Sequence, residues 1–194
     1  MFIEQKYLIN SIVQIQKSTL SVQEKIFEID NILFAISKTS WYRVGGNTFF
    51  NEYNEDYEAM LRDISFLESF PLYIKSDIYD EQKRNCVITH SCFIPLLNKD
   101  SKLKELNNFK EDILWNKYKY SSISNNKLKF FNIFGHTPVD SFFPDTKKKP
   151  SVYIDKKIGL ANVDTGACYD KDKRGFLSGI FFPSLKTVSV KSKF

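Results

Sequence analysis

The apolar residues of this chain change their spacing partway along, and this change constrains the fold more than any other feature. At the start, apolar positions such as Ile12, Ile15 and Ile26 follow one another at helical intervals, which is typical of amphipathic helices. Ser21 and Glu24 have the spacing of a capping box, so we expect a second helix to begin there. The opening stretch is therefore predicted to be a helix or a pair of helices.

The next segment contains turn signals and then another helical pattern. Paired glycines followed by an Asn within residues 41–48 predict a turn or loop. Asn54 can cap a helix whose first turn carries Glu55 and Asp56. Pro71 is expected to end this region.

Short apolar runs dominate the rest of the chain. Strands are predicted at residues 86–89, 128–134, 152–154, 158–163, 176–182 and 187–190, and a helix is predicted at residues 103–115. Helices followed by alternating strands and helices predict an α/β or α+β class with a layered core. A length of 194 residues suits a single domain, with a helical region at 1–75 and a sheet core at 76–194.

Composition excludes several classes of protein. The chain is 42% hydrophobic, enough for a core, but it has no apolar run approaching the ~20 residues of a membrane span. The net charge of +5 comes from scattered lysines, and the one compact run, residues 147–149, adjoins Pro150. Cys86, Cys92 and Cys168 lack metal-type spacing. We therefore expect a cytoplasmic protein with reduced thiols, and with neither nucleic acid nor a membrane as its partner.

The two histidines of the chain both lie at or near the ends of predicted strands. His90 follows residues 87–89 and His136 follows residues 132–135. Loops at the strand ends of layered α/β sheets present side chains into one crevice, and imidazole is the commonest metal ligand. Gly135 is expected to let the backbone turn so that the neighbouring imidazole faces the crevice. A packed histidine with no ligand is the alternative interpretation.

An ordered series of motifs connects these histidines to a known family. It runs through residues 87–93, 113–117, 133–138, 162–169 and 177–180, with further similarity at 41–48 and 66–73. The series resembles the C-terminal half of a calcineurin-like metallophosphoesterase, within the branch of bacterial serine/threonine protein phosphatases and symmetrical diadenosine tetraphosphate hydrolases. The resemblance implies the C-terminal part of a four-layer α/β/β/α sandwich, with a helical N-terminal cap.

The family hydrolyses phosphate esters or anhydrides, so the resemblance implies a phosphorylated substrate, either a phosphoprotein or a dinucleoside polyphosphate. It also implies a dinuclear centre of manganese, iron or zinc, in which His90 and His136 bind the second metal. Lys117 stands where the family usually has an arginine that contacts the substrate phosphate. Lysine keeps the charge but loses the bidentate fork, so a weaker grip on the phosphate is expected.

The motifs of the family's first half do not occur in this sequence. They are Gly-Asp-x-His-Gly, Gly-Asp-x-x-Asp-Arg-Gly and Gly-Asn-His-Glu, which supply the remaining metal ligands and the proton donor to the leaving group. The resemblance therefore implies a half enzyme that is inactive alone and needs a separately encoded N-terminal half. The alternative is a non-catalytic interaction module derived from a degenerate phosphatase.

Overall fold

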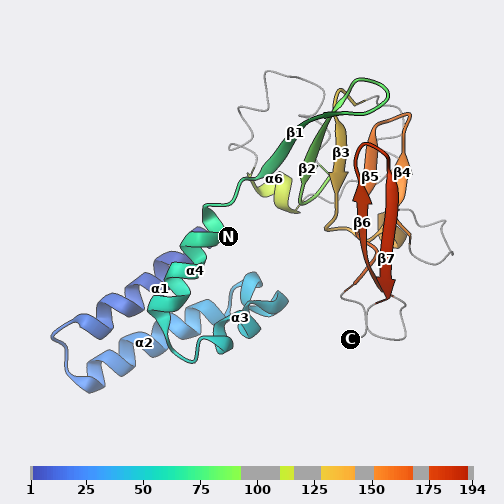
Figure 1. Ribbon diagram of the computed structural model, residues 1–194. Helices are drawn as coiled ribbons and strands as arrows, with labels where there is room; N and C mark the ends of the chain where they lie inside the picture. The colour runs from blue at the N-terminus through green and yellow to red at the C-terminus, as the bar shows by residue number, and fades with distance from the viewer. Residues whose placement is uncertain (1, 93–109, 116–127, 143–150, 168–174, 192–194) are drawn as a thin grey trace. The chain divides into compact units, whose positions relative to one another are not determined.

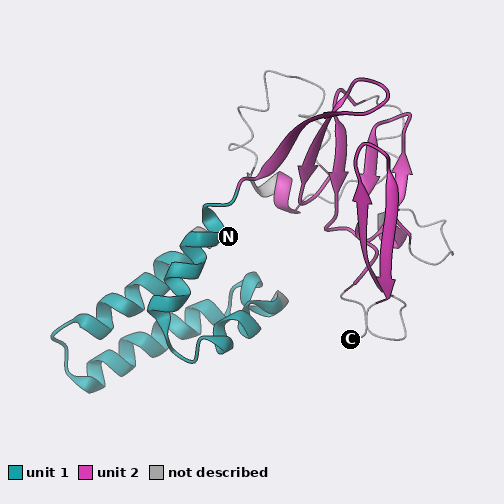
Figure 2. Ribbon diagram, in the orientation of Figure 1, with its two compact units in different colours: residues 1–70 teal, residues 71–194 magenta. Residues whose placement is uncertain are grey.

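Helices alone form the first part of the chain, and strands with short helices between them form the rest, as its apolar spacing predicts (Figure 1). The computed structural model describes residues 2–92, 110–115, 128–142, 151–167 and 175–191. The chain divides into two units, residues 1–70 and 71–194, coloured separately in Figure 2. The mixed α/β class predicted from the sequence is confirmed, with a mixed five-stranded sheet in the second unit.

The first unit is entirely helical. Its elements are α1 (Phe2–Lys17), α2 (Val22–Ser37), the π-helix η1 (Tyr42–Gly46), α3 (Asn47–Glu52) and α4 (Tyr57–Glu68). The core between them is formed by buried aliphatic side chains, among them Ile9, Ile12, Ile36, Met60 and Ile64. No helix in the described part of the chain is both long and apolar enough to cross a membrane.

The start of α2 follows the sequence prediction. Ser21 is the N-cap, and its hydroxyl accepts a hydrogen bond from the Glu24 backbone N–H. The Glu24 carboxylate in turn accepts one from the Ser21 backbone N–H at 2.9 Å. Both halves of the capping box are present, because each side chain satisfies a backbone donor that a helix start leaves unpaired.

Two local predictions in this unit are wrong. Residues 41–48 form helix rather than a loop, because Gly46 lets the chain pack against the Trp41 ring, which a Cβ at Gly46 would meet at 2.5 Å. Asn54 does not cap α4; it adopts a left-handed φ of 43°. Asp56 is the N-cap instead, and its Oδ1 accepts a hydrogen bond from the Ala59 backbone N–H at 2.9 Å.

The second unit is built on the five-stranded sheet, in the order β1-β2-β3-β5-β4. The strands are β1 (Tyr73–Tyr79), β2 (Asn85–Thr89), β3 (Phe131–Phe134), β4 (Tyr153–Asp155) and β5 (Leu160–Asn162). Short helices α6 (Lys110–Trp115) and α7 (Val139–Phe142) and the hairpin β6 (Phe176–Phe181) and β7 (Lys186–Lys191) complete it. The three central strands, β2, β3 and β5, run parallel, and β1 and β4 pair antiparallel at the two edges.

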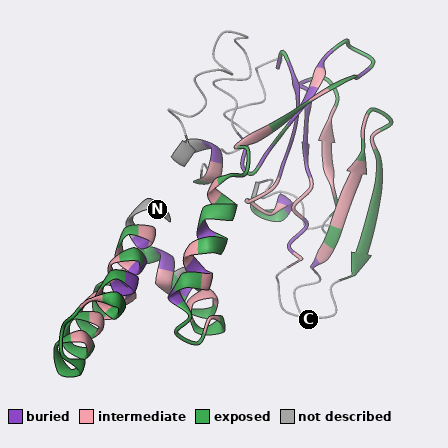
Figure 3. Cartoon of the chain, turned by 60° about the vertical axis from the view of Figure 1, so that its left-hand side comes forward, coloured by how far each residue is buried: buried purple, intermediate pink, exposed green. Residues whose placement is uncertain are grey.

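The three central strands of the sheet are largely buried (Figure 3). On one face, Phe131, Ile133 and Ala161 lie in a cluster against which residues of the hairpin region pack, including Ile180 and Phe182. The opposite face carries a second cluster, formed by Cys92, Leu128, Phe134, Val139, Ile158 and Leu160. Burial on both faces explains why β2, β3 and β5 read as short apolar runs without alternation.

The two cysteines within the described residues are buried, which disfavours the thiolate form. Cys86 and Cys92 are buried and form no disulfide. Burial raises the pKa of the Cys86 thiol to about 11 and also raises the pKa of the Cys92 thiol, because a thiolate loses its hydration there. Cys168 lies outside the described residues.

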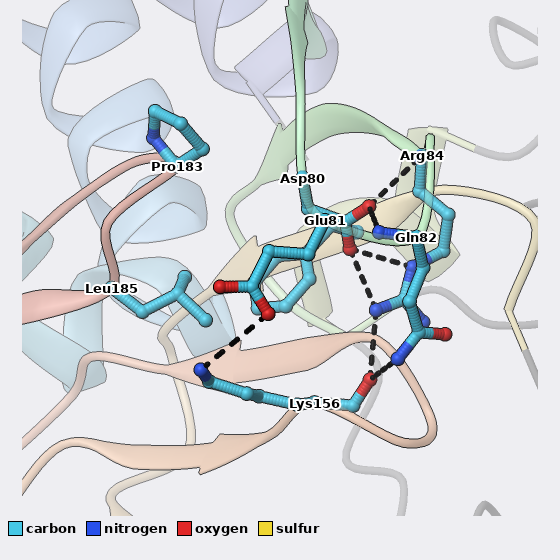
Figure 4. Close-up of a pocket in the computed structure, with 8 residues that line it drawn as sticks. Asp80, Glu81, Gln82, Arg84, Lys156, Pro183 and Leu185 are labelled. Carbon is cyan, nitrogen blue, oxygen red and sulfur yellow. Dashed lines mark hydrogen bonds and ion pairs between the residues drawn. The ribbon is translucent and has the colours of Figure 1, made fainter.

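A buried ion pair ties the turn between β1 and β2 to the turn between β4 and β5 (Figure 4). The Arg84 guanidinium donates to Asp80 Oδ2, to the Lys156 carbonyl at 2.8 Å and to the Ile158 carbonyl at 3.0 Å. Asp80 Oδ1 accepts from the Gln82 and Arg84 backbone N–H groups. One arginine therefore joins turns that belong to opposite edges of the sheet.

The electrostatic balance at Asp80 favours its charged form. Burial by itself raises the pKa of this carboxyl group, but the hydrogen bonds from Arg84 and Gln82 and the charge of Arg84 outweigh burial and lower the pKa. The carboxylate therefore contributes stability above its unfolded-state pKa of ~4. That contribution is lost as the pH falls through the lower folded-state value.

We predict that Asp80→Asn lowers the free energy of unfolding by roughly 3–5 kcal/mol at neutral pH, because it leaves the Arg84 charge buried without its partner. As the pH falls below ~4, the free energy of unfolding of the variant should also decrease less than that of the unchanged protein. Urea unfolding across a pH series measures both effects. Glu81→Gln is the matched control on the same turn: the Glu81–Lys156 pair is exposed and 4.0 Å long, so its loss should cost under ~1 kcal/mol. Equal losses for the two variants would contradict this account.

Candidate functional site

The two histidines lie at the ends of neighbouring parallel strands. His90 directly follows β2 and His136 lies two residues after β3. In the register of these strands Cys86 pairs with Phe131 and Ile88 with Ile133. Because parallel strands end at the same edge of a sheet, both imidazoles are delivered to one place.

The imidazole rings contact each other. Their centroids are 4.9 Å apart, with an angle of 47° between the planes. Trp115, the last residue of α6, lies edge-on to His136 at 5.5 Å. His90 is exposed and His136 is half-buried, so the pair lies at the surface and is open to solvent on the His90 side. Among the described residues, the structure brings together both histidines singled out from the sequence.

The backbone around His136 turns differently from the sequence prediction. His136 itself has the left-handed φ of 66°, whereas Gly135 keeps a negative φ. A Cβ at Gly135 would meet only Asp164 Cβ at 3.6 Å and the His90 carbonyl oxygen at 3.9 Å, which are ordinary contacts. The Gly135 N–H donates to that carbonyl at 3.0 Å, which joins the two histidine loops. The residue with the left-handed backbone in this turn is therefore His136, and the turn does not use the wider range of φ that Gly135 could adopt.

A buried polar network, which the sequence patterns did not predict, fixes the backbone on both sides of His90. The Asn132 side-chain amide donates to the Val87 carbonyl and to Thr89 Oγ1, each at 3.0 Å. Thr89 Oγ1 donates to the Ser91 carbonyl at 2.7 Å, and Ser91 Oγ donates to the Ile113 carbonyl at 2.6 Å. Thr89, Ser91 and Asn132 are at most 6% exposed. Buried polar groups persist in native structures when they are hydrogen-bonded, so an Asn within an otherwise apolar strand is the signal that could have revealed this network.

The end of β5 supports the neighbouring loop. The Asn162 side-chain amide donates to the Thr137 carbonyl at 2.9 Å, and the Val139 N–H donates to the Asp164 carbonyl at 2.8 Å. Asp164 Oδ1 accepts from the Gly166 N–H at 3.0 Å, which forms an Asx turn. The third parallel strand therefore holds the segment that follows His136.

Two further parts of the predicted site fall among residues that the structure does not describe. Lys117 lies outside the described residues, as does the part of the predicted helix 103–115 before Lys110. Within the described ranges, no group of three or more His, Cys, Asp or Glu side chains is arranged to hold a metal ion. Of the side chains that the sequence assigns to metal binding, both His90 and His136 lie within the described residues.

No family model, no curated protein and no solved structure matches this chain.

We predict that Thr89→Val lowers the free energy of unfolding by about 1–3 kcal/mol, because the buried Asn132 amide loses one of its two acceptors. The change should also shift the NMR signals of the His90 ring, since Thr89 fixes the backbone on both sides of it. Thr89→Ser retains the hydroxyl and is the matched control, which should restore the His90 signals. Unchanged His90 signals in the valine variant would show that the network does not position the ring.

Proposed function

We propose that this chain carries part of the metal site of a metal-dependent phosphoesterase, in which His90 and His136 bind one transition-metal ion. The observation that carries the proposal is the contact between the only two imidazoles of the chain, at the ends of adjacent parallel strands. The ordered motifs around both histidines support the same assignment.

The separation of the rings suits a shared ion. With metal–nitrogen bonds of about 2.1 Å, two imidazoles on one ion have ring centroids roughly 4.5–5.3 Å apart at octahedral or tetrahedral angles. The observed separation is 4.9 Å. Imidazole suits zinc, iron and manganese, the three metals that the family resemblance implies. The remaining coordination positions fall to water, to substrate or to groups beyond the described residues.

The proposed reaction is hydrolysis of a phosphate ester or anhydride, with a phosphoprotein or a dinucleoside polyphosphate as substrate. A metal centre of this kind supplies charge neutralisation at phosphoryl oxygens and lowers the pKa of bound water. In the proposal, the polar network holds His90 in place, Trp115 borders His136, and Lys117 contributes a positive charge to phosphate binding. The complete site belongs to a four-layer sandwich whose other catalytic groups come from a separate N-terminal half.

Metal binding tests the proposal directly. We predict that the protein binds Zn²⁺ or Mn²⁺ by titration calorimetry, and that His90→Ala or His136→Ala weakens binding by more than the ~10–100-fold typical of outer-shell changes. Affinity should fall as the pH is lowered, because a metal ion binds only the neutral imidazole. Ser141→Ala, an exposed change on nearby α7, is the control and should leave affinity unchanged.

Hydrolysis of p-nitrophenyl phosphate with manganese, with and without a supplied N-terminal half, tests the second part of the proposal. We expect turnover only when both halves are present, and no turnover when both histidines are changed to alanine. Robust turnover by this chain alone would contradict the half-enzyme proposal. Failure to bind metal would leave the non-catalytic interaction module as the better interpretation.

A further inference from the structure

The β6–β7 hairpin has one face against the sheet and one face in solvent. On the inner face, Ile180 packs on the core cluster of the sheet. Ser178 lies on the same face, and its hydroxyl is hydrogen-bonded to those of Thr165 and Ser189, each at 2.7 Å. This face is therefore fixed to the rest of the unit by apolar and polar contacts.

The outer face is apolar and exposed. In the hairpin register Leu177 pairs with Val190, Gly179 with Val188 and Phe181 with Lys186, so these six residues share one face. Its four large apolar side chains are Leu177, Phe181, Val188 and Val190, with exposed fractions of 69%, 58%, 53% and 66%. An apolar cluster of this kind on a soluble unit is typical of an interaction surface.

The strand β7 also has an open edge. Among the described residues it pairs with β6 alone, and all six of its residues are exposed (Figure 3). A free strand edge presents unpaired backbone N–H and C=O groups and is a ready template for another strand. The open edge and the apolar face meet at Val188 and Val190, so one added strand could use both.

The charge of the hairpin selects the kind of strand. Residues 175–191 contain Lys186 and Lys191, one at each end of β7, and no acidic residue. If all six residues of β7 paired antiparallel with those of its own copy across a two-fold axis, Lys186 of each chain would lie opposite Lys191 of the other. Like charges directly opposite each other destabilise strand pairs, which disfavours this self-pairing.

We infer that the free edge of β7 binds an extended segment of another polypeptide, one that carries acidic residues at its ends and apolar residues between them. Read antiparallel along β7, the matching segment has an acidic residue opposite Lys186, apolar residues opposite Val188 and Val190, and an acidic residue opposite Lys191. Polar residues such as threonine fit opposite Thr187 and Ser189. Main-chain hydrogen bonds supply affinity in such strand addition, and the alternate side chains supply specificity. This inference is independent of the metal site.

The test uses two fluorescein-labelled peptides and the full chain. Their core sequences are Glu-Val-Thr-Val-Thr-Glu and Lys-Val-Thr-Val-Thr-Lys, and binding is followed by fluorescence anisotropy at low salt. The glutamate peptide should bind about tenfold more tightly than the lysine peptide, since two cross-strand attractions become two repulsions. Amide NMR shifts on adding the glutamate peptide should concentrate in residues 186–191.

Charge reversal provides the decisive variant. In the Lys186→Glu, Lys191→Glu double variant the preference should invert, so that the lysine peptide binds more tightly. Both positions are exposed, so the fold should persist, and circular dichroism checks this. Lys157→Glu, an exposed lysine between β4 and β5, is the matched control and should leave the preference unchanged. Equal affinity for the two peptides, no binding of either, or self-association of the chain that charge reversal does not alter would overturn the inference.

Discussion

The parallel pairing of β2 with β3 is the constraint on which the candidate site depends. The register aligns Val87 with Asn132, and continuing it beyond the strands brings His90 beside Gly135. The Gly135 N–H donates to the His90 carbonyl at that point, so the pairing extends into the loops. His136 lies one residue further along, and its left-handed backbone accompanies the ring contact with His90. A slip of one residue in this register would face the two side chains differently and separate the imidazoles.

The same pairing explains the polar residues in an otherwise apolar sheet. Thr89 and Asn132 are buried, and burying such groups is costly unless they are hydrogen-bonded. The Thr89 hydroxyl and the Asn132 side-chain NH2 are hydrogen-bonded, whereas Asn132 Oδ1 has no partner among the described residues. Here their hydrogen bonds connect the ends of two strands and, through Ser91, the helix α6 that ends at Trp115. The network therefore links every described element that contributes a ring to the site. Arg84 has the corresponding structural role elsewhere in the sheet, where it joins turns from both edges.

The sequence predicted the parts of the fold that follow from local patterns. The helical start, the Ser21 capping box and the buried central strands have strong periodic or capping signals, and the structure has all three. The strand β1 was missed because it is an exposed edge strand whose charged and apolar residues follow no clear alternation. The helical path of residues 41–48 depends on Trp41 packing over Gly46, a contact that residue preferences do not contain. The positions of the two histidines at strand ends were enough to predict the pair. The polar network beneath the pair depends on the register between strands, which local sequence patterns do not show.

The most direct test of whether both imidazoles bind one ion is NMR spectroscopy of the ¹⁵N-labelled protein with ¹¹³Cd²⁺. The chain has only two histidines, so each ring gives its own set of nitrogen signals. The account predicts a single protein-bound ¹¹³Cd resonance with scalar coupling to a ring nitrogen of His90 and to a ring nitrogen of His136. Coupling to only one ring, separate cadmium signals for the two rings, or no coupling at all would contradict it.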